Sequence, residues 1–195
     1  MHSIRLATPN DAAAVADVYR PAVLDAATTF EDIPPDAAEF ARRIEKVLQR
    51  TPWLVWEEGN AILGYAYASP HRERSAYRWT VETSVYVAPG QQRRGIARGL
   101  YLNLFQRLTE QGFVNALAGV LLPNPGSVAL HESLGFARVG IYPGVGYKRG
   151  VWYDTAWYSR DLAPRRVPMG EVGWGARIAD AERHRDEPQA PHPAV

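Results

Sequence analysis

Apolar residues recur every three or four positions in four stretches of the chain, which is the spacing of one helix face. Each stretch opens near a capping residue, a proline or a glycine, as helix starts commonly do. The four helices are expected to begin after Thr8, Asp36, Gly95 and Asn124. Pro21 is expected to kink or end the first of them. Between the helices, alternating or continuous apolar runs predict strands over residues 3–7, 53–57, 61–69, 77–87, 113–122, 137–142 and 151–162.

Glycine-containing segments connect these strands. Gly59-Asn60 joins two of them and predicts a tight hairpin turn. The glycine-rich segment 143–150 is expected to be a loop between the last two strands. The order of elements predicts an α/β domain over residues 1–162, with a mixed, mostly antiparallel sheet flanked by helices. Residues 163–195 are rich in proline, arginine and acids, and are expected to form a mobile tail or a partner-binding extension.

Composition excludes several classes of protein. The chain has 195 residues, a hydrophobic content of 46% and a net charge of +1, which argues against bulk electrostatic binding to nucleic acid or membrane. The absence of cysteine removes disulfides, thiolate metal sites and a cysteine nucleophile. No apolar run reaches membrane-spanning length, and residues 1–5 lack the apolar stretch of a signal peptide. We therefore expect a cytoplasmic protein with neither a metal nor a membrane or nucleic-acid partner.

The turn at residues 92–98 has the features of a phosphate site. It follows a predicted strand, opens a predicted helix and reads Gln-Arg-Arg-Gly-Ile-Ala-Arg. Unpaired backbone N–H groups and the positive end of the helix dipole favour an anion there, and Gly95 lets the backbone approach it. An ordinary strand–helix turn with solvated arginines would have the same composition. The residues lack both a P-loop ending and the glycine pattern of a dinucleotide fold.

The predicted helix after Asn124 presents three polar residues on one face. Asn124, Ser127 and His131 follow one another at helical spacing. A packed, hydrogen-bonded histidine would explain His131 without any ligand. Beside the basic turn, the same three side chains instead indicate contact with a bound molecule.

Glu82 is the one charged residue in the strand 79–87. Alternation places it on the strand face shared with Thr80, Ser84 and Tyr86. A half-exposed strand position is one explanation. A carboxylate at the bottom of a cleft is the other, and such a group is suited to act as a general base.

The order strand, Gln-x-x-Gly-x-Ala, helix, strand, Asn-x-x-Ser, helix, Leu-Gly-Phe resembles the GNAT superfamily of N-acetyltransferases. Over residues 2–162 the chain is similar to its phosphinothricin N-acetyltransferase family. The matching segments are Phe30, Pro52-Trp53-Leu54-Val55, Ala76-Tyr77, Trp79-Thr80, Val85-Tyr86-Val87, Leu122-Pro123-Asn124, His131-Glu132, Leu134-Gly135-Phe136, Gly146-Tyr147-Lys148 and Trp152-Tyr153-Asp154. The tail lies outside the resemblance.

The resemblance implies direct acetyl transfer from acetyl-CoA to the α-amino group of a small amino-acid analogue, within a ternary complex. Glu82 would be the general base, and His131 would relay a proton, protonate the leaving thiolate or position the cofactor. The cofactor would contact a larger set of residues, namely Val85, Tyr86, Val87, Arg93, Arg94, Gly95, Ile96, Ala97, Arg98, Asn124 and Ser127. Relatives of this kind are dimers, so a homodimer is expected.

The resemblance also implies an acceptor pocket, lined by Phe30, Arg72, Arg74, Tyr77, Tyr147 and Lys148. The acceptors of the family are phosphinothricin and, in several bacterial relatives, methionine sulfoximine or sulfone. Position 71 is histidine where the phosphinothricin enzymes tend to have tryptophan, and position 73 is a glutamate between two arginines. Both differences leave the acceptor open.

Three other functions stay open from the sequence. One is acetylation of a different amine, such as a polyamine or a protein N-terminus. Another is a non-catalytic acyl-CoA-binding module, although the chain retains both Glu82 and His131. The third is an unrelated nucleotide-binding protein.

Overall fold

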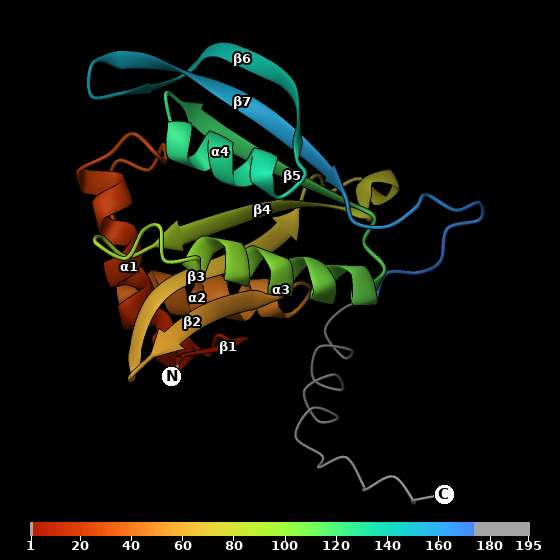
Figure 1. Cartoon of the computed structure of the whole chain (residues 1–195), viewed down its shortest axis with the longest axis horizontal. Helices are drawn as coiled ribbons and strands as arrows, with labels where there is room; N and C mark the ends of the chain where they lie inside the picture. The colour runs from red at the N-terminus through yellow and green to blue at the C-terminus, as the bar shows by residue number, and fades with distance from the viewer. Residues whose placement is uncertain (1, 174–195) are drawn as a thin grey trace, which may run out of the picture.

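The computed structural model describes residues 2–173 of the chain. These residues form one seven-stranded sheet with helices on both faces (Figure 1). The strand order is β1-β2-β3-β4-β5-β7-β6. The strands are β1 (His2–Leu6), β2 (Trp53–Glu58), β3 (Ala61–Pro70), β4 (Thr80–Val87), β5 (Asn115–Leu122), β6 (Ala137–Lys148) and β7 (Val151–Asp161).

The four predicted helices are confirmed. They are α1 (Ala12–Leu24), α2 (Ala37–Leu48), α3 (Ile96–Gln111) and α4 (Pro125–Ser133), with short 3₁₀ turns η1 (Pro9–Asp11) and η2 (Ser75–Tyr77). The Asp36 side chain caps α2 by accepting from Glu39 N at 2.8 Å. Pro21 does not end α1, which continues to Leu24 and closes with a hydrogen bond from Asp25 N to the Pro21 carbonyl. None of the described helices is long and apolar enough to cross a membrane.

The sheet separates two apolar clusters. α3 covers one face, where Leu100, Leu104 and Leu108 are completely buried. α1 and α2 cover the other face, where Phe40 and Ile44 pack against buried aromatic residues of β2 and β3. Burial on both faces explains why the central strands read as apolar runs, since neither face meets water.

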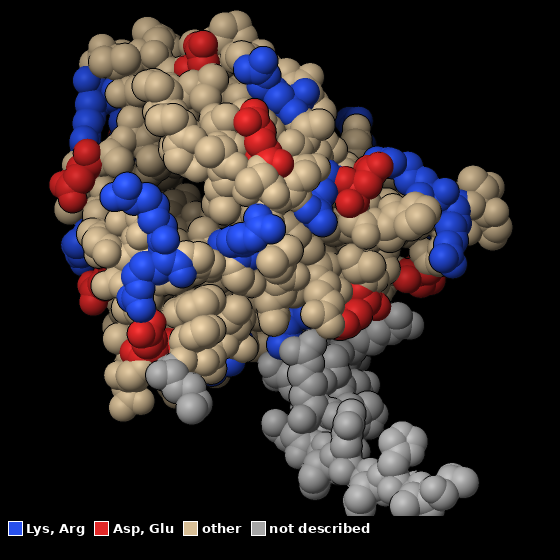
Figure 2. All heavy atoms as spheres, viewed as in Figure 1, with Lys and Arg blue, Asp and Glu red and all other residues tan. Residues whose placement is uncertain are grey.

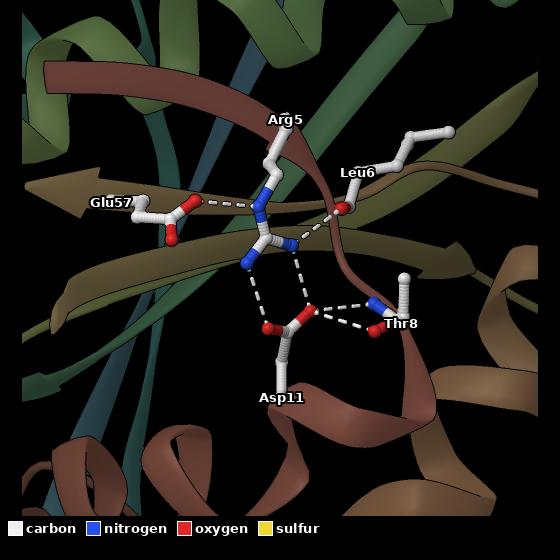
Figure 3. Close-up of polar contacts among 5 residues, drawn as sticks. All are labelled: Arg5, Leu6, Thr8, Asp11 and Glu57. Atoms are coloured by element: carbon white, nitrogen blue, oxygen red, sulfur yellow. Dashed lines mark hydrogen bonds and ion pairs between the residues drawn. The ribbon is translucent and has the colours of Figure 1, made fainter. Parts of the chain in front are cut away.

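Arg5 fixes the first strand to its neighbours (Figure 3). Its Nε donates to Glu57 of β2 at 2.7 Å, and its two terminal nitrogens donate to the Asp11 carboxylate at 2.8 Å each. The same carboxylate accepts from the Thr8 backbone N–H at 2.7 Å. The guanidinium therefore ties the edge strand β1 to β2 and to the turn that starts α1.

The loop predicted at residues 143–150 is wrong, because β6 runs through it to Lys148. The pairs Gly146↔Tyr153 and Lys148↔Val151 continue the antiparallel ladder with β7. A register shift between Tyr142 and Gly146 takes up the extra residues as a bulge. The turn itself lies at Arg149-Gly150, both with positive φ, which a two-residue hairpin turn of this kind requires.

The first part of the predicted tail packs on the domain. Val172 is 5% exposed and belongs to the α3-side core, and Gly173 N donates to the Gln111 carbonyl at 2.7 Å. Trp79 Nε1 donates to the Gly170 carbonyl at 2.8 Å. Residues 163–173 therefore contribute to the folded unit. The remainder of the predicted tail, residues 174–195, lies outside the described residues, and the domain boundary at 162 stays a prediction.

Candidate active site

The two central parallel strands separate along their length. β4 pairs with β5 at Thr80↔Asn115, Val81↔Ala116 and Glu82↔Leu117, and no later pair follows within the described part of the chain. Both strands nevertheless continue, each held on its other side by β3 or β7. Glu82 thus stands at the point where the sheet opens.

A cleft of about 870 Å³ occupies this opening. Its lining includes consecutive residues of β4, from Thr83 to Val87, together with residues 119–121 of β5. Since neighbouring residues of a strand point to opposite faces, a cleft lined by a consecutive run passes through the sheet. Figure 2 shows the hollow between α4 and the start of α3, with Lys and Arg side chains on its rim.

The basic turn lies at the mouth of this cleft. Arg93 and Gly95 have positive φ, of 62° and 82°, and α3 begins directly after them. An alanine Cβ at Gly95 would meet no atom within 4 Å, so this glycine is required by its backbone angle and faces open space. The turn residues lining the cleft are Gln92, Arg93, Gly95, Ile96, Ala97 and Arg98.

Arg94 is the one arginine of the turn that does not line the cleft. Its Nη2 lies 3.0 Å from Glu58 Oε2, and Nη1 also donates to the Gln91 side chain. The Arg94 guanidinium is therefore directed to the β2–β3 hairpin. Its predicted contact with a cofactor has no support from this geometry.

The polar face of α4 lines the opposite side of the cleft. Asn124 caps α4 by accepting from Ser127 N at 3.0 Å, and Asn124, Ser127 and His131 all face the cleft. His131 is 3% exposed. Its Nδ1 lies 2.7 Å from the Ser127 carbonyl and its Nε2 lies 3.1 Å from Tyr101 Oη. The carbonyl can only accept, so Nδ1 carries the proton and Nε2 accepts from Tyr101.

Burial lowers the pKa of His131 below its ordinary value, which favours a neutral imidazole in the folded protein at neutral pH. In the unfolded chain the pKa returns to about 6.5. As the pH falls through that value, the unfolded chain binds a proton that the folded protein does not. The contribution of His131 to the free energy of unfolding therefore decreases until the pH reaches the lowered folded pKa.

We expect His131→Phe to reduce the pH dependence of stability. The variant loses the Ser127 and Tyr101 hydrogen bonds and is less stable overall, but its free energy of unfolding changes less than that of the wild type between about pH 7.5 and about pH 5.5. Urea unfolding at several pH values measures this. His2→Phe, at an exposed position on β1, is the matched control and keeps the wild-type slope. Equal slopes in wild type and His131→Phe would contradict the expectation.

Glu82 is surrounded by groups that follow β3. Its Oε1 lies 2.7 Å from His71 Nδ1 and 3.8 Å from Arg72 Nη1. The Tyr77 ring packs edge-on against His71, with centroids 5.5 Å apart. Arg72 and Arg74 line a second cavity of about 770 Å³, whose wall contains Tyr67 and the buried Trp53. The Arg72 guanidinium, which lies beside Glu82, therefore belongs to a cavity with basic and aromatic walls.

The other predicted acceptor residues lie at the β6–β7 hairpin. Phe30 packs directly on Gly146, whose missing side chain leaves room for the ring. Tyr147 is 58% exposed and its ring contacts Trp152. Lys148 is 2% exposed and its Nζ donates to the Thr29 carbonyl at 2.8 Å. Its ammonium thus holds the loop after α1, and the predicted acceptor contact of Lys148 has no support from this arrangement.

Two residues of the site are missing from the sequence-based set. One is Tyr101 of α3, whose hydroxyl contacts His131 and which lines the cleft. His71 was noted only as a difference from the phosphinothricin enzymes. The β3–β4 register Ser69↔Glu82 brings it beside Glu82. No local pattern in the sequence specifies this register, so the sequence carried no signal for the contact.

A cleft through a partly parallel sheet, with a basic glycine turn at its mouth, defines an acyl-CoA-type transferase fold. Residues 4–157 match the family model of the acetyltransferase (GNAT) domain. The chain therefore belongs to the GNAT family of acetyltransferases and is an enzyme of that class.

Two relatives of known name and one solved structure are particularly similar. Phosphinothricin N-acetyltransferase of Streptomyces viridochromogenes is 40% identical over 159 residues, covering 82% of this chain and 87% of its own. L-methionine sulfoximine/L-methionine sulfone acetyltransferase of Salmonella typhimurium is 35% identical over 167 residues, covering 85% and 98%. The phosphinothricin acetyltransferase of Sinorhizobium meliloti, solved in complex with AcCoA, is 35% identical with a TM-score of 0.82, covering 90% and 96%.

Proposed function

We propose that this protein transfers an acetyl group from acetyl-CoA to the α-amino group of a small amino-acid analogue, of the phosphinothricin or methionine sulfoximine and sulfone type. Transfer would be direct, with both substrates bound together. The observation that carries the proposal is the position of Glu82, at the point where β4 and β5 separate and beside the Arg72 guanidinium. The names of the relatives support the acceptor class.

Acetyl-CoA would lie through the opening in the sheet. The pyrophosphate would bind the turn at the start of α3, where Gly95, the first N–H groups of the helix, Arg93 and Arg98 surround an open space. The pantetheine arm would follow the backbone of Val85, Tyr86 and Val87, with Asn124 and Ser127 on its other side. Within residues 2–173, no group of three or more His, Asp or Glu side chains is arranged to hold a metal ion.

The chemistry requires removal of one proton before transfer, because an ammonium has no lone pair for attack. Glu82 takes this proton, and the nitrogen lone pair attacks the thioester carbonyl. A backbone N–H of β4 is a suitable donor to the oxyanion that forms. The C–S bond then breaks, and the thiolate takes up the second proton, which the nitrogen loses as the amide forms. Both nitrogens of His131 are engaged and its ring is neutral, which supports a positioning role for His131 over that of the acid.

The anionic groups of the acceptor would bind Arg72, which lies next to Glu82, and Arg74. Phosphinothricin carries a carboxylate and a phosphinate, and methionine sulfone carries a carboxylate and tetrahedral oxygens. Arg72 and Arg74 line the same cavity and present guanidinium groups that suit such oxygens. Tyr77 and Tyr67 would cover the apolar part of the acceptor.

The test is thiol release from acetyl-CoA with five acceptors, namely phosphinothricin, methionine sulfoximine, methionine sulfone, spermidine and a short peptide. We expect turnover with at least one of the first three. Turnover with spermidine or the peptide alone would indicate a different class of acceptor, whose reacting amine has no free carboxylate on the neighbouring carbon. Binding of acetyl-CoA without turnover of any acceptor would contradict the proposed reaction. A cytoplasmic location stays a prediction.

A homodimer is the proposed assembly. β6 forms one edge of the sheet (Figure 1), and the β6–β7 hairpin exposes several large apolar side chains, here called the hairpin patch. The patch consists of Val139, Ile141, Tyr142, Val145, Tyr147, Val151 and Trp152. Exposed edge strands and large apolar patches of this kind commonly mark interfaces between subunits.

We expect Trp152→Glu to shift a dimer towards monomer. Trp152 is 66% exposed, and a charge in the centre of an apolar interface raises the dissociation constant by about 30-fold or more. Sedimentation velocity over a range of concentrations measures this. Leu102→Glu, on the exposed side of α3 at 47% exposure, is the matched control and leaves the association unchanged. A dimer as tight in Trp152→Glu as in the wild type would rule out this patch.

A further inference from the structure

Glu82 is held by one of its two oxygens. Oε1 accepts from His71 Nδ1 at 2.7 Å and lies 3.8 Å from Arg72 Nη1. An ionised carboxylate has no hydrogen to give, so Nδ1 carries the proton and donates it. Within the described residues, no hydrogen bond engages Oε2. The carboxylate is thus oriented through Oε1, and Oε2 is the oxygen left for an acceptor ammonium.

His71 is itself fixed from three elements. It directly follows β3, and its backbone N–H donates to Thr80 of β4 at 3.4 Å. Its ring packs edge-on against Tyr77 of η2 and against Trp157 of β7, with centroids 5.5 Å and 6.5 Å apart. The side chain is 17% exposed. A ring enclosed in this way has few alternative rotamers, so it holds Glu82 in one orientation.

Two polar side chains contact the imidazole, and a third bonds the backbone beside it. The Glu82 carboxylate accepts from the imidazole and the Tyr77 ring packs edge-on against it, while the Arg72 guanidinium donates to the His71 backbone carbonyl at 3.1 Å. Arg72 is the more exposed of the two partners of Glu82 and is also the more distant. His71 therefore has the better geometry for orienting the carboxylate, while Arg72 stays available to an anionic acceptor.

We propose that His71 is a positioning residue for the general base, fixing Glu82 Oε1 so that Oε2 meets the acceptor nitrogen. The inference rests on the proposed function of Glu82. During transfer the acceptor N–H proton goes to Oε2, the nitrogen lone pair forms the new C–N bond, and His71 keeps its own proton throughout. His71 does not touch either substrate in this scheme, and it acts only through Glu82.

The test is a double-mutant cycle with His71→Phe and Glu82→Gln. Phenylalanine keeps the planar ring between Tyr77 and Trp157 but removes the donor. We expect His71→Phe to lower kcat roughly 10- to 100-fold, the loss of one hydrogen bond to a charged group, with the KM for acetyl-CoA unchanged. In the Glu82→Gln background the same change costs less than about threefold, because the oriented base is already gone.

Rescue separates hydrogen bonding from packing. His71→Asn places an amide N–H near the position of Nδ1 without the ring, and is expected to recover kcat to within about fivefold of the wild type. His2→Phe is the matched control, because it makes the same substitution away from Glu82. His2 lies on the edge strand β1, which two strands separate from β4, and stacks on Trp56 of β2. Thermal melting of each variant confirms that kcat refers to folded protein.

Two results would overturn the proposal for His71 alone. One is wild-type kcat in His71→Phe, and the other is an equal loss from His71→Phe in the wild-type and Glu82→Gln backgrounds, which is the behaviour of a purely structural residue. A Glu82→Gln variant with a kcat within threefold of the wild type would instead show that Glu82 is not the general base. The proposed function of Glu82 would then fail, and the inference about His71 with it.

Discussion

Replacing Glu82 with glutamine is expected to lower kcat about 10²- to 10⁴-fold, the usual contribution of a general base. Glutamine has nearly the same shape, but its amide cannot take a proton at neutral pH. The KM for acetyl-CoA is expected to stay within about threefold of the wild type, because Glu82 stands at the last β4–β5 pair and is not among the residues that line the cleft. Steady-state thiol release measures both constants.

The pH dependence of the activity that Glu82→Gln loses gives a second readout. Raising the pH increases the fraction of acceptor that already has a free amine, and this fraction needs no base. The ratio of wild-type to Glu82→Gln activity is therefore expected to shrink as the pH rises. Glu110→Gln, on the exposed end of α3, is the matched control and keeps wild-type kinetics. A kcat within threefold of the wild type in Glu82→Gln would exclude Glu82 as the base.

Replacing Gly95 with valine is expected to raise the KM for acetyl-CoA about 10- to 100-fold, which corresponds to the loss of one or two backbone hydrogen bonds to a charged group. Gly95 has a φ of 82° and lines the cleft at the start of α3. A β-branched side chain there projects into the space proposed for the pyrophosphate and strains the turn. The expected change in kcat at saturating acetyl-CoA is small, because the valine is remote from Glu82.

Gly90→Val separates strain from binding. Gly90 has a φ of 76° and, like Gly95, would meet no atom within 4 Å with a Cβ added. It is absent from the residues that line the cleft. Both variants are expected to lose roughly 1–2 kcal/mol of unfolding free energy from the left-handed backbone, while only Gly95→Val weakens acetyl-CoA binding. Equal KM values for acetyl-CoA in the two variants would contradict the proposed pyrophosphate site.

Local signals in the sequence were sufficient where a few neighbouring residues determine the conformation. The hairpin at Gly59-Asn60 has positive φ at both positions, as the dipeptide predicts. Asn124 and Asp36 cap their helices by hydrogen bonds to residues three positions on. Each of these features depends on one turn of chain, so propensity and spacing describe it well.

Local patterns were insufficient where the outcome depends on distant partners. The segment 143–150 has the composition of a loop, yet pairing with β7 makes its first part a strand. The acceptor contact of Lys148 stays a prediction, and no local pattern indicated that its ammonium contacts a carbonyl 119 residues away, in the loop after α1. The cofactor contact of Arg94 also stays a prediction, and no local pattern indicated its ion pair with Glu58 of the neighbouring hairpin. The competing partner lies far along the chain in each case, so spacing alone does not indicate it.

The sequence by itself determined the family, the order of helices and strands and the basic turn before α3, and it predicted the roles of Glu82 and His131. These follow from short motifs, from periodicity and from a resemblance spread over most of the chain. Only the tertiary structure decided that β4 and β5 separate after Glu82, that His131 is neutral and bound to Tyr101, and that His71 holds the carboxylate. The reason is physical, since strand register and burial arise from contacts between segments that no local pattern specifies.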